Sequence, residues 1–115
     1  MDLQLKEKVA VVTGGSAGIG LAIARGLAAE GVHLVLSARD GDRLTAVADT
    51  IKTDFGVRAF GVPADIGSPA GTDRLAGAVG ELFGGADILI NNAGTGSEET
   101  ILEAPDERWQ SYWEL

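Results

Sequence analysis

The chain has 115 residues, 45% of them hydrophobic, which suffices for the core of one domain. Its formal net charge of −8 disfavours nucleic acid or an anionic membrane surface as the main partner. Because the sequence has no cysteine, disulfides, zinc–thiolate sites and thiol catalysis are excluded. No apolar run approaches the roughly 18 residues of a membrane span, and the first residues form no signal core, so we expect a cytoplasmic protein.

Apolar periodicity predicts alternating strands and helices along the chain. In chain order we expect a strand over 9–12, a helix over 18–30, a strand over 32–38, a helix ending at Gly56, a strand over 57–62, a helix ending at Gly84 and a strand over 88–90. A polar loop through Pro105 and a helix over 106–115 follow. The 17 glycines separate these periodic segments, as is typical of tight turns between strands and helices.

Strands joined by right-handed helical crossovers form a doubly wound parallel sheet, a Rossmann fold, here with strand order 3-2-1-4. Ligands bind such sheets at the carboxyl ends of the strands, where the order reverses. The chemically unusual residues of this chain all follow strands at that edge, in the segments 13–20, 37–39, 65–66 and 91–94. We therefore expect a ligand site there.

The glycine-rich segment 13–20 indicates what the ligand is. We expect Gly14 to let the chain reverse, Gly18 to let the backbone approach a pyrophosphate, and Gly20 to let the next helix pack closely. The phosphates would lie against free amides at the positive end of the helix dipole. A triphosphatase phosphate loop is disfavoured, because it carries Lys-Ser or Lys-Thr where this chain has Leu21-Ala22. Taken alone, the segment also fits a turn whose glycines serve only the fold.

Two motifs together point to a family. Thr13-Gly14-x-x-x-Gly18-Ile19-Gly20 and Asn91-Asn92-Ala93-Gly94 resemble the short-chain dehydrogenase/reductase family, with Asp65 and Trp109 fitting the same pattern. The resemblance, which runs from about Lys8 to Leu115, implies an NAD(P)-binding Rossmann domain over 1–115. It also implies hydride transfer between a nicotinamide and an alcohol or carbonyl substrate of low molecular weight, in a homo-oligomeric enzyme.

The resemblance assigns cofactor contacts to residues at the carboxyl edge. Five residues of the glycine-rich segment would line the pyrophosphate: Gly14, Ser16, Gly18, Ile19 and Gly20. Asp65 would hold the adenine amino group through its carboxylate, with Ile66 against the ring. The segment after the fourth strand would tie that strand to its neighbour and pass beneath the riboses. Its residues are Asn91, Asn92, Ala93 and Gly94. We expect neither a catalytic residue nor a metal site within the chain.

The end of the second strand favours NADP over NAD. NAD-binding members of the family carry an acid at the position of Ala38, where it accepts hydrogen bonds from both ribose hydroxyls. Ser37 and Arg39 flank this alanine, and a guanidinium can bind a 2′-phosphate and stack on adenine. Asp40 and the lack of a basic residue at Ser16 or Ala17 point the other way, and Arg39 is alternatively a solvated loop cation.

The resemblance also implies chemistry that this sequence does not carry. The family's Tyr-x-x-x-Lys pair and its catalytic serine are absent, and Tyr112, the one tyrosine, comes too early in the pattern. We expect the cofactor-binding half of an enzyme about twice this length, inactive by itself and prone to self-association through an uncovered sheet. The alternatives are a non-catalytic dinucleotide-binding or scaffold module and, less favoured, a methyltransferase. His33, Glu98 and Glu99 fit structural or solvated positions.

Overall fold

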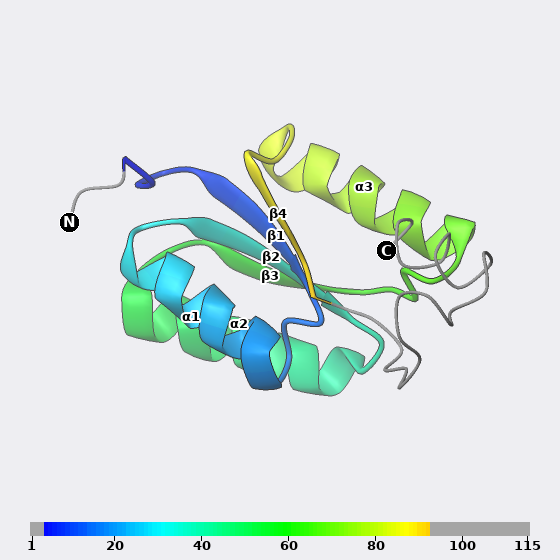
Figure 1. The fold of residues 1–115 in the computed structure, drawn as a ribbon, viewed down its shortest axis with the longest axis horizontal. Coiled ribbons are helices and arrows are strands. Elements are labelled where there is room, and N and C mark those ends of the chain that lie inside the picture. Colours follow the sequence, from blue (N-terminus) through cyan, green and yellow to red (C-terminus); the bar gives the residue numbers. More distant parts are fainter. Residues whose placement is uncertain (1–3, 93–115) are drawn as a thin grey trace, which may run out of the picture.

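The computed structural model describes residues 4–92 as a parallel sheet between two layers of helices (Figure 1). The elements are β1 (Val9–Thr13), α1 (Gly18–Ala29), β2 (His33–Ala38), α2 (Gly41–Phe55), β3 (Ala59–Pro63), α3 (Pro69–Phe83) and β4 (Ile88–Asn91). Helices α1 and α2 cover one face of the sheet, and α3 covers the other (Figure 1). The predicted helix over 106–115 and the residues Ala93, Gly94, Glu98 and Glu99 lie outside the described residues.

All strand pairs are parallel, and the strand order is β3-β2-β1-β4. The predicted doubly wound fold and its strand order are therefore confirmed. Each crossover passes through one helix, which places the loops that follow the strands together at one edge of the sheet.

The core has two layers because successive residues of a buried strand point to opposite faces. In β2, Leu34 and Leu36 pack with α1 and α2, whereas Val35 packs with the residues under α3. This double burial explains why β2 is nearly continuous in apolar character. On the α2 side, Leu44 and Ile51 are fully buried.

Two strand starts differ from the prediction, and β1, β3 and β4 each end one residue later than predicted. Strand β2 begins at His33 instead of 32, and β3 begins at Ala59 instead of 57. Val32 and Val57 are nonetheless buried, at 0% and 6% exposed. The apolar pattern of a sequence indicates which residues are buried, whereas a strand is defined by its ladder of hydrogen bonds. Buried residues just before a strand are therefore easily predicted to be part of it.

The helices α2 and α3 begin at side-chain caps and end at the predicted glycines. The Asp40 carboxylate accepts a hydrogen bond from the backbone N–H of Arg43, and the Ser68 hydroxyl accepts one from Gly71. Gly56 and Gly84 terminate the two helices. Both helix starts therefore satisfy part of their own free backbone donors.

Candidate functional site

The register of the sheet aligns the carboxyl ends of all four strands. Thr13 of β1 pairs with Ser37 of β2 and with Asn91 of β4, and Ser37 pairs with Val62 of β3. The loops that follow these residues carry the predicted site. The edge includes the point between β1 and β4 where the chain's direction of winding reverses, which is where ligands bind such sheets.

Thr13 joins β1 to β4 at this edge. Its side chain is buried, and its hydroxyl oxygen lies 3.3 Å from the Ile90 carbonyl and 3.1 Å from Asn91 Oδ1, either of which can accept its proton. The same oxygen accepts a hydrogen bond from the Asn92 N–H at 3.0 Å. Sequence reasoning expected Asn91 and Asn92 to tie β4 to its neighbour but did not identify Thr13 as the partner.

The loop between β1 and α1 is held to β2 by its backbone. The N–H of Gly14 donates to the Ser37 carbonyl at 2.7 Å, and Gly14 adopts a φ of 68°, which favours glycine. A Cβ added at Gly20 would overlap the Gly14 carbonyl and lie 2.8 Å from Asn92 Nδ2. The close approach predicted at Gly20 is thus between the start of α1, the glycine turn and the residue that follows β4.

Helix α1 begins without a side-chain cap, unlike α2 and α3. Its N-cap residue is Ala17, whose side chain has no hydrogen-bond acceptor for the N–H groups of the first turn. Gly18 has a φ of 58°, and a Cβ added there would meet nothing within 4 Å. Ile19 is 72% exposed. This uncapped turn lies at the positive end of the helix dipole, where backbone N–H groups can bind an anion.

Ser37, which we predict to be a cofactor-binding residue, has a buried side chain at the end of β2. Its side chain is 1% exposed, and its hydroxyl donates to the Val62 carbonyl at 3.0 Å. Ser37 has the same strand parity as Val35 and therefore turns into the core. It supports the site by joining β3 and the glycine loop to β2, whereas Arg39 and Asp40 are exposed just beyond.

Asp65 and Ile66, which follow β3, also differ from each other in exposure. Asp65 is exposed, and its Oδ1 accepts a hydrogen bond from the Gly67 N–H at 3.0 Å. Ile66 is 8% exposed and packs in the core under α3. Ile66 also lines a pocket with Gly67 and Ser68, and its predicted contact with the adenine ring stays a prediction.

Arg43 is a member of this edge that sequence reasoning missed. It lies in the first turn of α2, and its Nε donates to the Ser16 carbonyl at 2.9 Å. The signal was available: Asp40 is a favourable N-cap residue, which puts Arg43 in the turn nearest the carboxyl edge. What the sequence did not give was the contact with the glycine loop.

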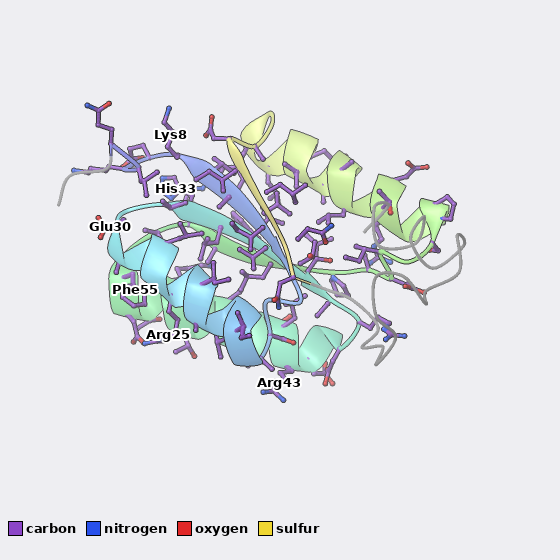
Figure 2. The ribbon with its side chains drawn as sticks, in the orientation of Figure 1. Lys8, Arg25, Glu30, His33, Arg43 and Phe55 are labelled. Atoms are coloured by element: carbon purple, nitrogen blue, oxygen red, sulfur yellow. The ribbon has the colours of Figure 1, made fainter. Side chains whose placement is uncertain are left out.

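The polar groups around His33 lie at the opposite end of the strands from the glycine loop, as Figure 2 shows for His33 and Arg43. His33 Nδ1 accepts a hydrogen bond from the Arg58 N–H at 3.0 Å, and Nε2 lies 2.8 Å from Glu7 Oε2. The hydrogen bond with His33, and then the charge of the ring, hold the pKa of the Glu7 carboxyl below its usual value. These contacts join the segment before β1 to β2 and β3, so His33 has a structural role.

Within residues 4–92, no cluster of three potential metal ligands is present. In the same part of the chain, no helix is both long and apolar enough to cross a membrane.

With this geometry established, comparison with known proteins identifies the family. A family model described as short chain dehydrogenase matches residues 8–115. The chain belongs to the short-chain dehydrogenase family. The resemblance drawn from the glycine and Asn-Asn-Ala-Gly motifs is therefore confirmed.

Individual relatives cover nearly all of the chain. It is 42% identical to a rhamnolipids biosynthesis 3-oxoacyl-(acyl-carrier-protein) reductase of Pseudomonas aeruginosa, over 96% of this chain and 43% of the relative. An L-sorbose reductase from Gluconobacter frateurii, solved with NADPH and L-sorbose, is 58% identical over 100% of this chain and 44% of its own, with a TM-score of 0.85.

A third relative was solved with the other nicotinamide cofactor. This short chain dehydrogenase/reductase from Burkholderia phymatum, in complex with NAD, is 36% identical over 93% of this chain and 38% of its own, with a TM-score of 0.77. The chain thus spans less than half the length of these relatives.

Replacing Thr13 with valine tests the junction between β1 and β4. The variant leaves the Asn92 N–H without its acceptor, so we expect the free energy of unfolding to fall by about 1–3 kcal/mol. Thr13→Ser keeps the hydroxyl and loses one methyl group, which costs about 1 kcal/mol. Denaturant unfolding of both variants measures the difference. A valine variant more stable than the serine variant would show that Thr13 acts through its methyl group and not through its hydroxyl.

Proposed function

We propose that this chain is the cofactor-binding half, over residues 1–115, of an oxidoreductase that interconverts an alcohol and a carbonyl compound with NADP as its cofactor. The observation that carries the proposal is the uncapped, open start of α1 beside the winding reversal between β1 and β4. Membership of the short-chain dehydrogenase family supports hydride transfer as the reaction. The whole protein, in this proposal, is a cytoplasmic homo-oligomer acting on a small molecule.

The residues around the start of α1 fit a pyrophosphate. The protein is acidic overall, with a net charge of −8, so local donors must hold any anion. Backbone N–H groups of Ser16, Gly18, Ile19 and Gly20 would supply them, with Gly14 forming the turn. At Gly18 no atom lies within 4 Å of an added Cβ, which leaves room for a phosphate to reach the backbone.

The neighbouring loops fit the rest of a dinucleotide. Asp65 has one carboxylate oxygen held by the Gly67 N–H, which would orient the other toward an adenine amino group. The exposed Asn91 and Asn92 would lie beneath the riboses, and Ala93 and Gly94 would continue that contact. Ile66, which lines a pocket with Gly67 and Ser68, would lie against the adenine ring. We assign the buried side chain of Ser37 to the support of these loops.

The chain's own residues bind and orient, whereas the cofactor, when bound, supplies or accepts the hydride. No residue of the 115 is proposed as the proton donor, because the family's Tyr-x-x-x-Lys pair is absent from this sequence. The proton donor and the residue that orients the substrate oxygen are therefore proposed to belong to the rest of the whole protein.

The preference for NADP is supported by charge at the end of β2. Ala38 cannot accept hydrogen bonds from ribose hydroxyls, and the exposed Arg39 can form charge-assisted bonds to a 2′-phosphate. The L-sorbose reductase at 58% identity was solved with NADPH, which agrees with this preference.

Calorimetric titration of the whole protein with NADPH and NADH tests the cofactor preference. A charge-assisted contact contributes about 1.5–3 kcal/mol, so NADPH should bind about 10–150-fold more tightly. Arg39→Gln should reduce that ratio and leave NADH affinity near the wild-type value. Equal affinities of the wild type for both cofactors would contradict the preference for NADP while leaving the pyrophosphate site untouched.

Oxidation of NADPH with a panel of ketones tests whether this chain only binds the cofactor while the rest of the whole protein supplies the proton donor. The 115-residue chain should remain near the uncatalysed rate, because general acid catalysis alone typically contributes about 10²–10⁴-fold. A longer protein that carries Tyr-x-x-x-Lys should turn over. Turnover by the short chain would overturn the assignment and make Tyr112, Glu98 and Glu99 the first residues to replace. Inactivity of the longer protein would favour a binding module.

A further inference from the structure

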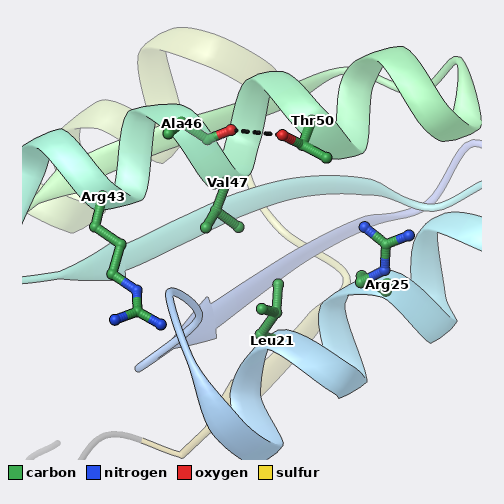
Figure 3. A pocket seen from close by; sticks show the side chains of 6 residues that line it. All are labelled: Leu21, Arg25, Arg43, Ala46, Val47 and Thr50. Atoms are coloured by element: carbon green, nitrogen blue, oxygen red, sulfur yellow. Dashed lines mark hydrogen bonds between the residues drawn. The ribbon is translucent and has the colours of Figure 1, made fainter.

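A groove between α1 and α2 has an arginine at each end. It has a volume of about 200 Å³, and its apolar lining comes mainly from Leu21 and Val47 (Figure 3). Arg25 at one end is paired with Asp54 at 3.3 Å. Arg43 at the other end extends toward the loop between β1 and α1, as Figure 3 shows, and donates from Nε to the Ser16 carbonyl at 2.9 Å.

The Arg43 guanidinium is held by a hydrogen bond from one of its three nitrogens, Nε. Among the described residues, 4–92, no carboxylate pairs with it, since the two ion pairs there join Arg25 to Asp54 and His33 to Glu7. The Asp40 carboxylate nearby accepts its hydrogen bond from the backbone of Arg43 and not from the guanidinium. The bond from Nε orients the planar group and leaves its terminal N–H donors for a ligand. Such a held, planar donor set suits a phosphate.

Arg43 also supplies a positive charge beside the glycine loop, which has no basic residue of its own. Neither Ser16 nor Ala17 is basic, yet the contact at Ser16 brings a cation from α2 to this loop. Arg39 lies one residue beyond the end of β2 and four residues before Arg43. Both arginines therefore lie between the end of β2 and the first turn of α2, at the edge that carries the loop proposed to hold the pyrophosphate.

We propose that Arg43 is a specificity-determining residue that binds the 2′-phosphate of NADP together with Arg39. This inference rests on the proposed function, because it requires a dinucleotide at the glycine loop. The competing explanation is that Arg43 only braces the loop. If Arg43 only stabilises the loop, it should contribute equally to the affinities for NADP and NAD, since both place a pyrophosphate there. If it contacts the 2′-phosphate, it should contribute to the affinity for NADP alone.

The test measures four dissociation constants for the whole protein, with NADPH, NADH, 2′,5′-ADP and ADP as probes. Arg43→Gln should weaken NADPH and 2′,5′-ADP about 10–100-fold, as expected for the loss of charge-assisted hydrogen bonds, and leave NADH and ADP within about threefold. Arg25→Gln is the matched control, because it removes the same type of side chain from the other end of the groove. It should change none of the four constants.

Equal weakening of all four ligands by Arg43→Gln would show a brace and overturn the proposal, as would no weakening at all. Where the glutamine variant does not fold, Arg43→Lys keeps the charge without the planar fork, and it should still weaken the two 2′-phosphate ligands selectively. Equal constants for that variant and the wild type would also overturn the proposal. A wild-type protein that binds none of the four ligands would instead contradict the proposed function.

Discussion

The hydrogen bonds at the end of β1 fix the geometry of the whole carboxyl edge. On one side the Gly14 N–H donates to the Ser37 carbonyl at 2.7 Å, and on the other the Thr13 hydroxyl accepts from the Asn92 N–H at 3.0 Å. The turn after β1 is thereby tied to both neighbouring strands. Helix α1 must then begin against that turn, which is why no Cβ fits at Gly20.

Once the turn is fixed, the starts of the helices lie at the same edge, because every strand is parallel to its neighbours and each helix follows a strand. Two of these helix starts are capped by their own side chains, from Asp40 and Ser68. The start of α1 has no such cap, and it lies at the same edge, where the strand order reverses between β1 and β4. In a protein of net charge −8, the proposed anion site would depend on local backbone donors and the nearby arginines.

The elements and strand order could be predicted because apolar periodicity follows burial, and burial organises this sheet. The same link explains the errors at Val32 and Val57, which are buried without belonging to a ladder. Within the site, the glycines were predictable from the backbone geometry they allow. The burial of Ser37 and Ile66, and the contact of Arg43 with Ser16, depend on how side chains from separate elements meet, which no local pattern encodes.

The central claim, that the start of α1 holds a dinucleotide, is tested most directly by mapping backbone amide shifts by NMR as NADPH is added. The account predicts the largest changes at the N–H groups of residues 14–20, with further changes at Arg39 and Asp65. Amides near His33 and Arg58, where the strands begin, should stay nearly unchanged. Changes confined to that far end, or absent from the glycine loop at saturation, would contradict the account.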